Sequence, residues 1–335
     1  MVLVTGGTGL VGAHLLLHLL QNGNEVRATH RKESNLKQVE KVFRYYSEDA
    51  TLLFSKIDWF EADLNNIPAL ELAFKNVDYV YHAAAFISFD PRDYKKLLKI
   101  NAEGTANIVN LCISHAVKKL CYVSTIGTIG KSLNTTIATE ENEWNDQNVN
   151  VYALSKYEAE MEVWRGSQEG LSVVMVNPGV IIGPGFWNTG SGALFSTANK
   201  GYNYYPPGGT GFITVHDVIK MITTLMDSQI KNERFIAVAE NLSFQEILIR
   251  LTKELNKPAP KKILKYWQLE IGRIGDFLWS SLTGKSRRIT KNSIHSMKHR
   301  DTYGNQKIQE FLDFKFESLE PTITFSCRRF LEENL

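Results

Sequence analysis

Two short stretches of the chain hold side chains that together can move a proton. Tyr152 and Lys156 are four residues apart, so on a helix both project from one face. An ammonium beside a phenol favours the ionised form of the phenol, and the pair then acts as a proton donor and acceptor. Ser124 and Thr125 follow an apolar run, and a hydroxyl there can hold a substrate oxygen while the phenol exchanges its proton.

The start of the chain, VLVTGGTGLVG, is an apolar run that breaks into glycines and continues with leucines at helical spacing. This order of strand, turn and helix is the context that a dinucleotide-binding fingerprint requires. Gly6 can take backbone angles closed to other residues, Gly9 lets the main chain approach a pyrophosphate, and Gly12 allows close helix packing. The pyrophosphate would sit at the helix N-terminus. The alternative is a glycine-rich turn that serves only as a connection.

The composition narrows the class of protein. The chain has 335 residues, 43% hydrophobic and 22% charged, as in a globular protein with a sizeable core and one or two domains. Its 38 Lys and Arg against 36 Asp and Glu give a net charge of +2, so we expect no nucleic-acid partner.

The cysteines and the apolar runs bear on location and metal binding. Cys112, Cys121 and Cys327 are far apart and lie in apolar runs, which favours buried reduced thiols. The sequence has no CxxC or Cys/His cluster, so we expect no metal. A strand is predicted from residue 2 onward and no apolar run reaches membrane-spanning length, so we expect a cytoplasmic protein.

Short apolar runs alternate with amphipathic stretches along the first half of the chain. Further strands are predicted over residues 25–29, 57–61, 78–83, 119–124 and 171–177. Helices are predicted over residues 67–74, 93–115 and 152–165. The alternation indicates an α/β, Rossmann-type doubly wound parallel sheet with helices on both faces. Ligands of such sheets collect at the C-terminal ends of the strands, where Ser124 and Thr125 are expected.

The pattern changes after Pro178. Residues 179–212 are rich in glycine, proline and aromatic residues, which predicts a loop-rich wall over a pocket more than a sheet. Residues 215–226 predict a helix and residues 234–238 a further strand. Ser243 and Glu246 have capping-box spacing at the start of the next helix.

One later segment is both amphipathic and basic. Apolar residues recur at helical spacing from Leu264 to Leu282, with Lys and Arg on both flanks. A basic amphipathic helix can lie on a membrane. We favour a helix of the substrate domain with solvated ends, and expect no membrane partner.

Together these motifs resemble the extended short-chain dehydrogenase/reductase superfamily, in its epimerase/dehydratase branch. The ordered matches are TGGTGLVG, Asp63-Leu64, HAAA at 82–85, NAEGT at 101–105, YALSK at 152–156, NPGVIIGPG at 177–185 and FITVHDV at 212–218. The segments EVRATHRKESNLK and YALSKYEAEMEVW are similar to those of dihydroflavonol reductases. The resemblance implies a Rossmann domain at 1–178, to which 213–238 returns, and a smaller, mostly helical substrate domain at 179–212 and 239–335.

The resemblance also implies roles for residues. Tyr152 would be the catalytic acid/base, and Lys156 would bind ribose and lower the pKa of the phenol. Thr125 would be the catalytic hydroxyl, with Ser124 beside the nicotinamide, and Asn101 would steady the fourth helix. The other expected cofactor contacts are Thr5, Gly6, Gly9, Leu10, Val11, Gly12, His30, Arg31, Lys37, Asp63, Leu64, Ala83, Ala84, Ala85, Pro178, Gly179 and Val180.

The expected substrate is a small, fairly apolar ketone or aldehyde, or the corresponding alcohol. Residues 179–212 contain no arginine, the residue that grips a diphosphate through two hydrogen bonds. The alternatives are a nucleotide-sugar epimerase or dehydratase, and a non-catalytic protein that senses a dinucleotide.

The expected cofactor is NADP(H) in preference to NAD(H). NAD-specific sites place an Asp or Glu at the end of the second strand, where it bonds the ribose and repels a 2′-phosphate. Here that place holds His30 and Arg31, and the guanidinium suits two contacts to phosphate oxygens. Lys37 adds a second charge. The alternative is a solvated basic corner without a ligand.

We also expect a homodimer. The helices over residues 93–115 and 152–165 correspond to those through which the superfamily commonly pairs. Their predicted outward residues include Tyr94, Leu98, Ala159 and Met161.

Overall fold

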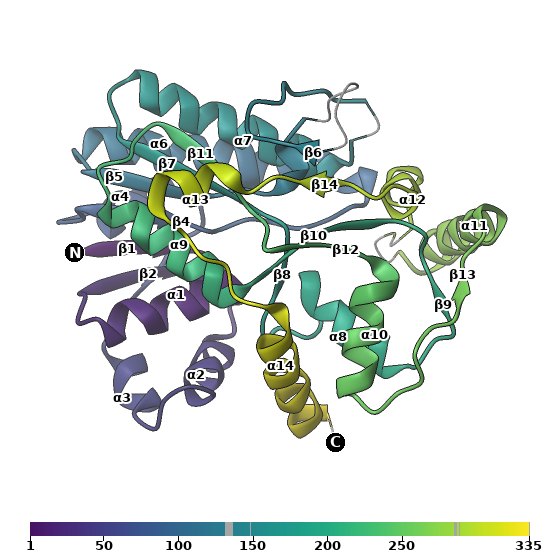
Figure 1. The fold of residues 1–335 in the computed structure, drawn as a ribbon. Helices are drawn as coiled ribbons and strands as arrows, with labels where there is room; N and C mark the ends of the chain where they lie inside the picture. The colour runs from purple at the N-terminus through teal and green to yellow at the C-terminus, as the bar shows by residue number, and fades with distance from the viewer. Residues whose placement is uncertain (131–136, 148, 285–286, 288, 335) are drawn as a thin grey trace.

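The computed structural model describes residues 1–130, 137–147, 149–284, 287 and 289–334. Within these residues the centre of the molecule is a sheet of seven parallel strands (Figure 1). In spatial order they are β11 (Glu233–Ala237), β7 (Val173–Pro178), β5 (Lys119–Val123), β4 (Tyr79–His82), β1 (Val2–Thr5), β2 (Val26–His30) and β3 (Asp58–Glu61). The predicted strands of the first half all lie in this sheet, which confirms the doubly wound fold.

Helices cover both faces of the sheet. One core cluster joins β1 to α1 (Leu10–Gln21), α2 (Leu36–Arg44), α3 (Ala50–Ser55) and α9 (Val215–Asp227). The cluster on the other face joins the sheet to α4 (Ile67–Ala73), α6 (Gly104–Ser114) and α7 (Val151–Gln168). Alternate residues of β1 serve the two clusters, since Val2 and Val4 lie in the first and Leu3 in the second. The chain order reverses between β1 and β4, which is where such folds bind ligands.

The helix predicted over residues 93–115 is confirmed, but it is not α-helical throughout. It begins with the short η1 (Pro91–Asp93) and α5 (Tyr94–Leu97), and passes through a π-helical segment, η2 (Leu98–Glu103), before α6. Ala159, predicted to face outward, is fully buried in the cluster beneath α7. That part of the dimer prediction is wrong, because the inward face of α7 is wider than its apolar pattern suggested.

The prediction of a loop-rich wall over residues 179–212 is also wrong. This stretch forms β8 (Val180–Ile182), η4 (Gly190–Gly192), α8 (Ala193–Asn199), β9 (Tyr204–Tyr205) and the start of β10 (Gly209–Thr214). β10 pairs with β8 in parallel and with β12 (Glu240–Ser243) antiparallel. Ile182 and Phe212 are fully buried in a third core cluster, and this burial holds the glycine-rich segment in ordered strands.

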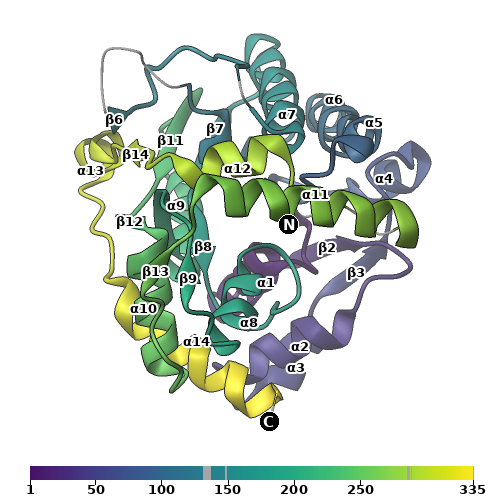
Figure 2. The same ribbon diagram turned by 90° about the vertical axis from the view of Figure 1, so that its right-hand side faces the viewer.

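The remaining elements form the smaller, mostly helical region (Figure 2). They are α10 (Phe244–Glu254), α11 (Tyr266–Thr283), α12 (Lys291–Lys298), α13 (Gln306–Leu312) and α14 (Leu319–Asn334). Two short parallel pairs join β9 to β13 (Lys262–Ile263) and β6 (Ile137–Ala138) to β14 (Thr302–Tyr303). The predicted capping box of Ser243 and Glu246 is confirmed at the start of α10. Ile308 of α13 packs back into the cluster around α1.

The cysteines are buried and free of disulfides, as predicted. Among the described residues, no helix is both long and apolar enough to cross a membrane.

Candidate active site

The glycine turn after β1 leaves space at the N-terminus of α1. Gly6 has a φ of +74°, and a Cβ on Gly12 would collide with the carbonyl oxygen of Gly6, so the fold itself requires both glycines. Gly9 has an ordinary φ of −103°, and a Cβ there would meet nothing closer than 3.5 Å. Packing therefore does not require a glycine at position 9. Its missing side chain keeps the space before α1 open, and a dinucleotide pyrophosphate fits there.

The three alanines after β4 lie beside this turn. Ala84 is so close that a Cβ on Gly6 would lie 2.6 Å from its backbone nitrogen. Thr5 is fully buried, whereas Leu10 and Val11 in the first turn of α1 are half-buried. The predicted contacts at 5–12 and 83–85 therefore meet at one place, because β1 and β4 are neighbouring strands.

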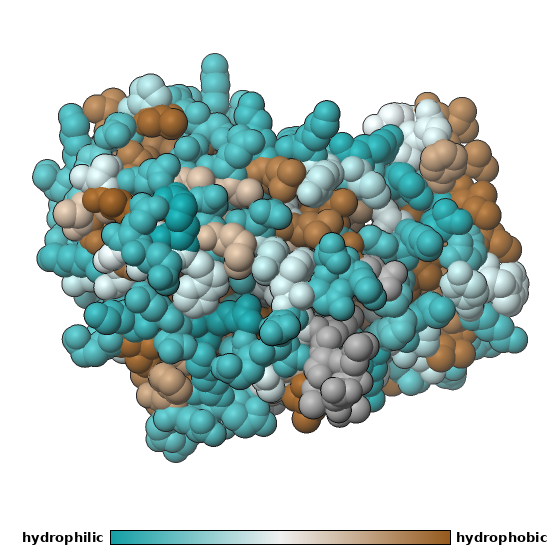
Figure 3. Space-filling view, turned by 90° about the horizontal axis from the view of Figure 1, so that it is seen from above, coloured by the Kyte–Doolittle hydropathy of each residue, from teal (hydrophilic) through white to brown (hydrophobic). Residues whose placement is uncertain are grey.

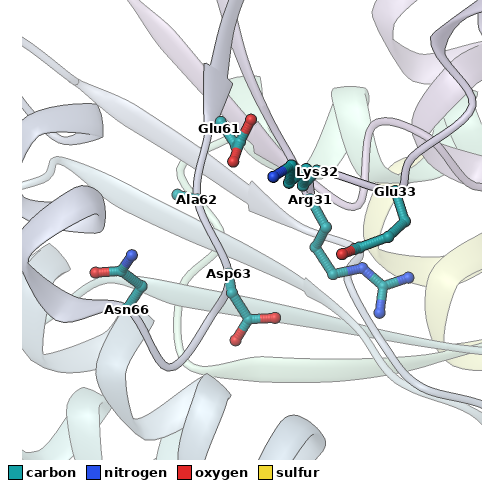
Figure 4. A pocket seen from close by; sticks show the side chains of 7 residues that line it. All are labelled: Arg31, Lys32, Glu33, Glu61, Ala62, Asp63 and Asn66. Carbon is teal, nitrogen blue, oxygen red and sulfur yellow. The ribbon is translucent and has the colours of Figure 1, made fainter.

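A cavity of about 230 Å³ lies further along the same edge of the sheet (Figure 4). The segments that follow β2 and β3 line it, with Arg31, Lys32, Glu33, Glu61, Ala62, Asp63 and Asn66. His30 packs edge-on against Trp59, and the Arg31 side chain is exposed. Lys37 is exposed in the first turn of α2, and Leu64 is buried beneath. Both cations of the cavity follow β2, and acids come from both segments, at the place where an adenosine would sit.

Lys156 is held under the end of β5. Its Nζ donates to the carbonyl oxygen of Val123 at 2.9 Å and lies 4.2 Å from the centroid of the Tyr122 ring. Burial lowers the pKa of Lys156 to about 7, while the charge of Glu160 opposes that shift. Burial also raises the pKa of the Tyr152 phenol to about 12. Removal from water thus dominates the acidity of both groups in the free protein.

The two hydroxyls after β5 differ in their partners. Ser124 is 5% exposed, and its Oγ has no hydrogen-bond partner. Thr125 is half-buried, and its Oγ1 accepts from the backbone nitrogen of Gly127 at 3.2 Å. A buried hydroxyl without a partner is costly unless a ligand satisfies it. Ser124 therefore fits the expected place beside a bound nicotinamide.

Asn101 ties two parts of the site together. Its side chain exchanges two hydrogen bonds with the backbone of Phe86 (2.8 and 3.0 Å) and donates to Ser155 Oγ at 2.9 Å. It lies in the π-helical segment and is 1% exposed. Asn101 therefore fixes the loop after β4 against α7. Pro178, Gly179 and Val180 stand at the end of β7, where the backbone nitrogen of Gly179 bonds to Ala237.

The sequence analysis placed His82 within the HAAA motif but gave its side chain no role. Its ring bridges Thr5 Oγ1 at 2.6 Å and Thr105 Oγ1 at 2.9 Å, and stacks on Tyr122. Burial and the charge of Lys156 lower the pKa of His82 to about 3, so the imidazole is neutral. The signal available in the sequence was that His82 is a polar residue at the end of an apolar strand.

Glu160 was missed as well. Its Oε1 accepts from Thr128 Oγ1 and from Asn177 Nδ2, both at 2.6 Å, and its Oε2 lies 3.7 Å from Arg234. The residue is fully buried one turn beyond Lys156. Its four-residue spacing from Lys156 was visible in the sequence, but its partners come from η3 (Ile126–Thr128), β7 and β11.

The profile of the NAD dependent epimerase/dehydratase family matches residues 2–238. The chain belongs to this family. A member from Synechocystis named "Putative dihydroflavonol 4-reductase" is 30% identical over 79% of this chain and 75% of its own. The sterol demethylase protein B of Methylococcus capsulatus is 27% identical over 77% of this chain and 76% of its own.

Solved structures show the same fold for this family member. The UDP-glucose 4-epimerase of Thermotoga maritima, solved with UDP-glucose, superposes with a TM-score of 0.77 over 99% of both chains, at 19% identity. The likeness extends beyond residue 238, so the C-terminal helical region belongs to the shared architecture.

Proposed function

We propose that this chain is an NAD(P)-dependent oxidoreductase that reduces a ketone or aldehyde of a small, fairly apolar substrate, or oxidises the alcohol. One observation carries the proposal: the Phe89 ring lies edge-on against Tyr152, with ring centroids 5.8 Å apart. Phe89 and nearby Ile87 are 44% and 49% exposed. An apolar surface beside the acid/base favours a substrate that buries carbon rather than a sugar diphosphate.

The cations near this surface support the same choice. Arg92 forms hydrogen bonds with both carboxylate oxygens of Asp90, and Arg234 donates to the carbonyl oxygen of Glu140. Residues 179–212 contain no arginine. The guanidinium groups of Arg92 and Arg234 are therefore engaged within the protein, which disfavours the epimerase alternative.

The proposed roles follow from the positions of the side chains. Tyr152 gives its proton to the carbonyl oxygen of the substrate, and Thr125 holds that oxygen by a hydrogen bond. Lys156 places a positive charge beneath them and would bond to the ribose hydroxyls of a bound cofactor. The chemistry that a nicotinamide would supply there is transfer of the hydride.

NADP(H) is the proposed cofactor. The exposed Arg31 guanidinium lies in the cavity at the end of β2, with Lys32 beside it. The ribose end of an adenosine in this cavity would face that guanidinium, which suits a 2′-phosphate. The acids Glu33, Glu61 and Asp63 line the same cavity, and Asp63 suits the adenine amino group.

The names of the relatives support a substrate with an apolar ring system. One is named for a dihydroflavonol and another for a sterol. A test incubates the protein with reduced cofactor and a panel of cyclic ketones, aldehydes and nucleotide sugars. We expect carbonyl compounds alone to oxidise the cofactor. Conversion of a nucleotide sugar without net oxidation would contradict the proposal, and activity with neither class would favour the non-catalytic sensor.

A further inference from the structure

The positive charge of the chain is concentrated in one segment. Residues 257–300 hold eleven Lys and Arg against two Asp and Glu, which gives this segment a charge of +9 and the rest of the chain −7. The overall balance of +2 therefore hides a strong separation of charge. The segment contains α11 and α12.

Helix α11 turns its apolar side away from the protein. Its buried residues, Leu269 and Ser280, share one side of the helix. At 3.6 residues per turn, the opposite side carries positions 267, 271, 274, 278 and 282. These form what we call the outward stripe: Trp267 (58% exposed), Ile271 (60%), Ile274 (51%), Leu278 (56%) and Leu282 (85%). Figure 3 shows hydrophobic side chains gathered at the end of the molecule where Figure 1 places α11.

Polar contacts attach α11 to the protein alongside the buried Leu269. Ser280 Oγ accepts a hydrogen bond from Arg92 at 2.6 Å, and Asp276 accepts one from the backbone of Ile289 at 3.0 Å. Glu270 pairs with Arg273 at 2.7 Å. Asp276 and Glu270, the two acids of residues 257–300, therefore both have partners within the same segment. The outward stripe takes no part in these contacts, so it is left for another surface.

Exposed lysines adjoin the outward stripe. Lys261, Lys262 and Lys265 stand directly before the first turn of α11, with their side chains in solvent. Lys298 of α12 lies 4.2 Å from the centroid of the exposed Tyr266 ring. Lys285 and Arg288, which the sequence places after α11, lie outside the described residues.

We propose that α11 lies in the plane of an anionic phospholipid bilayer. The outward stripe would enter the boundary between headgroups and acyl chains, and the lysines would meet lipid phosphates. Trp267 and Tyr266 suit that boundary because their rings are apolar while one end is polar. Charge argues against a second copy of this chain on the stripe, because two segments of +9 would repel each other.

The side of α11 opposite the stripe is linked to the candidate active site. Figure 2 shows α11 running across the side of the molecule that faces the viewer. Arg92, which bonds to Ser280, is held by Asp90, and the adjacent Phe89 packs on Tyr152. An apolar carbonyl compound dissolved in the bilayer would reach Tyr152 past Phe89. This statement about the substrate rests on the proposed function, whereas bilayer binding does not.

The test measures sedimentation of the full chain with two kinds of vesicle. One is phosphatidylcholine alone, and the other is equal parts of phosphatidylcholine and phosphatidylglycerol. We expect binding to the anionic vesicles, weakened by salt, with a blue shift of tryptophan fluorescence. Ile271→Ser with Leu278→Ser should weaken binding by at least about tenfold. The matched control is Leu52→Ser with Leu72→Ser, at positions 58% and 50% exposed on α3 and α4, and should bind as wild type does.

A charge variant separates the contribution of the lysines to vesicle binding from that of the apolar outward stripe. Lys261→Glu, Lys262→Glu and Lys265→Glu together should remove the preference for anionic vesicles. The proposal is overturned if wild type binds neither vesicle, if the stripe variant binds as tightly as the control, or if the stripe variant abolishes a dimer in lipid-free buffer. A reductase assay on a water-soluble ketone without vesicles reports separately on the proposed function.

Discussion

Glu160 lies one helical turn beyond Lys156, on the buried side of α7, and its negative charge opposes the effect of burial on the lysine. The carboxylate is fixed by Thr128 and Asn177, each at 2.6 Å. Lys156 itself is fixed by the carbonyl oxygen of Val123. The charge state of the lysine therefore depends on a residue that contacts neither the proposed substrate nor the cofactor.

The first prediction concerns this pair. Burial lowers the pKa of Lys156 to about 7, so its ammonium is present below that pH and is lost as the pH rises through it. Glu160→Gln removes the charge that opposes the shift, and the pKa should fall further. We expect the alkaline loss of cofactor binding to move to lower pH by about one unit. The measurement is the dissociation constant of the reduced cofactor against pH. Glu158→Gln, exposed on the same helix, should leave the profile unchanged, and identical profiles for both variants would contradict the coupling.

The second prediction concerns the acid/base. Tyr152→Phe keeps the ring that packs against Phe89 but removes the proton that the substrate oxygen needs. We expect kcat to fall by at least about a hundredfold, with cofactor affinity nearly unchanged. Steady-state kinetics and cofactor titration check both statements. Near-normal turnover would refute the assignment.

The neighbouring hydroxyls give an internal comparison for that prediction. Thr125→Val should impair turnover more than Ser124→Ala, because Thr125 is the half-buried residue of the two and is assigned to the substrate oxygen. The reverse order would move the catalytic role to Ser124.

The third prediction concerns the choice of cofactor. Arg31→Ala should raise the KM for NADPH much more than that for NADH, since only NADPH carries the 2′-phosphate. Lys56→Ala is the matched control, because Lys56 is an exposed cation just before β3, at the opposite edge of the sheet from the cavity. A wild type that prefers NADH, or an equal loss for both cofactors, would refute the assignment.

The fourth prediction concerns stability in acid. The folded protein holds His82 neutral with a pKa lowered to about 3, whereas the unfolded chain binds a proton near pH 6.5. The unfolded state therefore gains a proton first as the pH falls, and stability is lost between about pH 6.5 and 3, by about 1.4 kcal/mol per unit for this histidine.

Urea unfolding at several pH values tests this slope. His82→Gln should flatten the dependence by that amount, while His14, whose pKa is also lowered to about 3, keeps its own contribution. The control is His299→Gln, at an exposed position. A slope in His82→Gln equal to that of the control would be inconsistent with a neutral buried imidazole.

The fifth prediction is a homodimer formed through α5, α6 and α7. Tyr94 and Met161 are 36% and 37% exposed, and both remain available for such an interface, whereas Ala159 is buried within the protomer. Tyr94→Glu with Met161→Glu should shift the molecule to a monomer. Burial of two unpaired carboxylates in the interface would cost more free energy than the apolar contacts of such an interface contribute. Light scattering at micromolar concentration measures the state, and a monomeric wild type would contradict the prediction.

The local pattern of the sequence determined much of the fold and part of the site. Short apolar runs predicted the strands of the parallel sheet, because a strand buried on both faces is apolar throughout, whereas a helix buried on one side leaves a periodic stripe. The glycine turn and the four-residue spacing of Tyr152 and Lys156 were equally visible. In each case the residues that specify the structure lie within a few positions of one another.

Only the tertiary structure decided the contacts between distant segments. Ala84 meets Gly6 because β4 pairs with β1, and Glu160 meets Asn177 and Thr128 because α7 packs across the ends of two strands. The sequence showed the apolar stripe of α11, but it did not show whether the stripe faces the protein or the solvent. Contacts that include the hydrogen bond between Ser280 and Arg92, 188 residues apart, accompany that orientation, and no periodicity in the sequence records a contact of that kind.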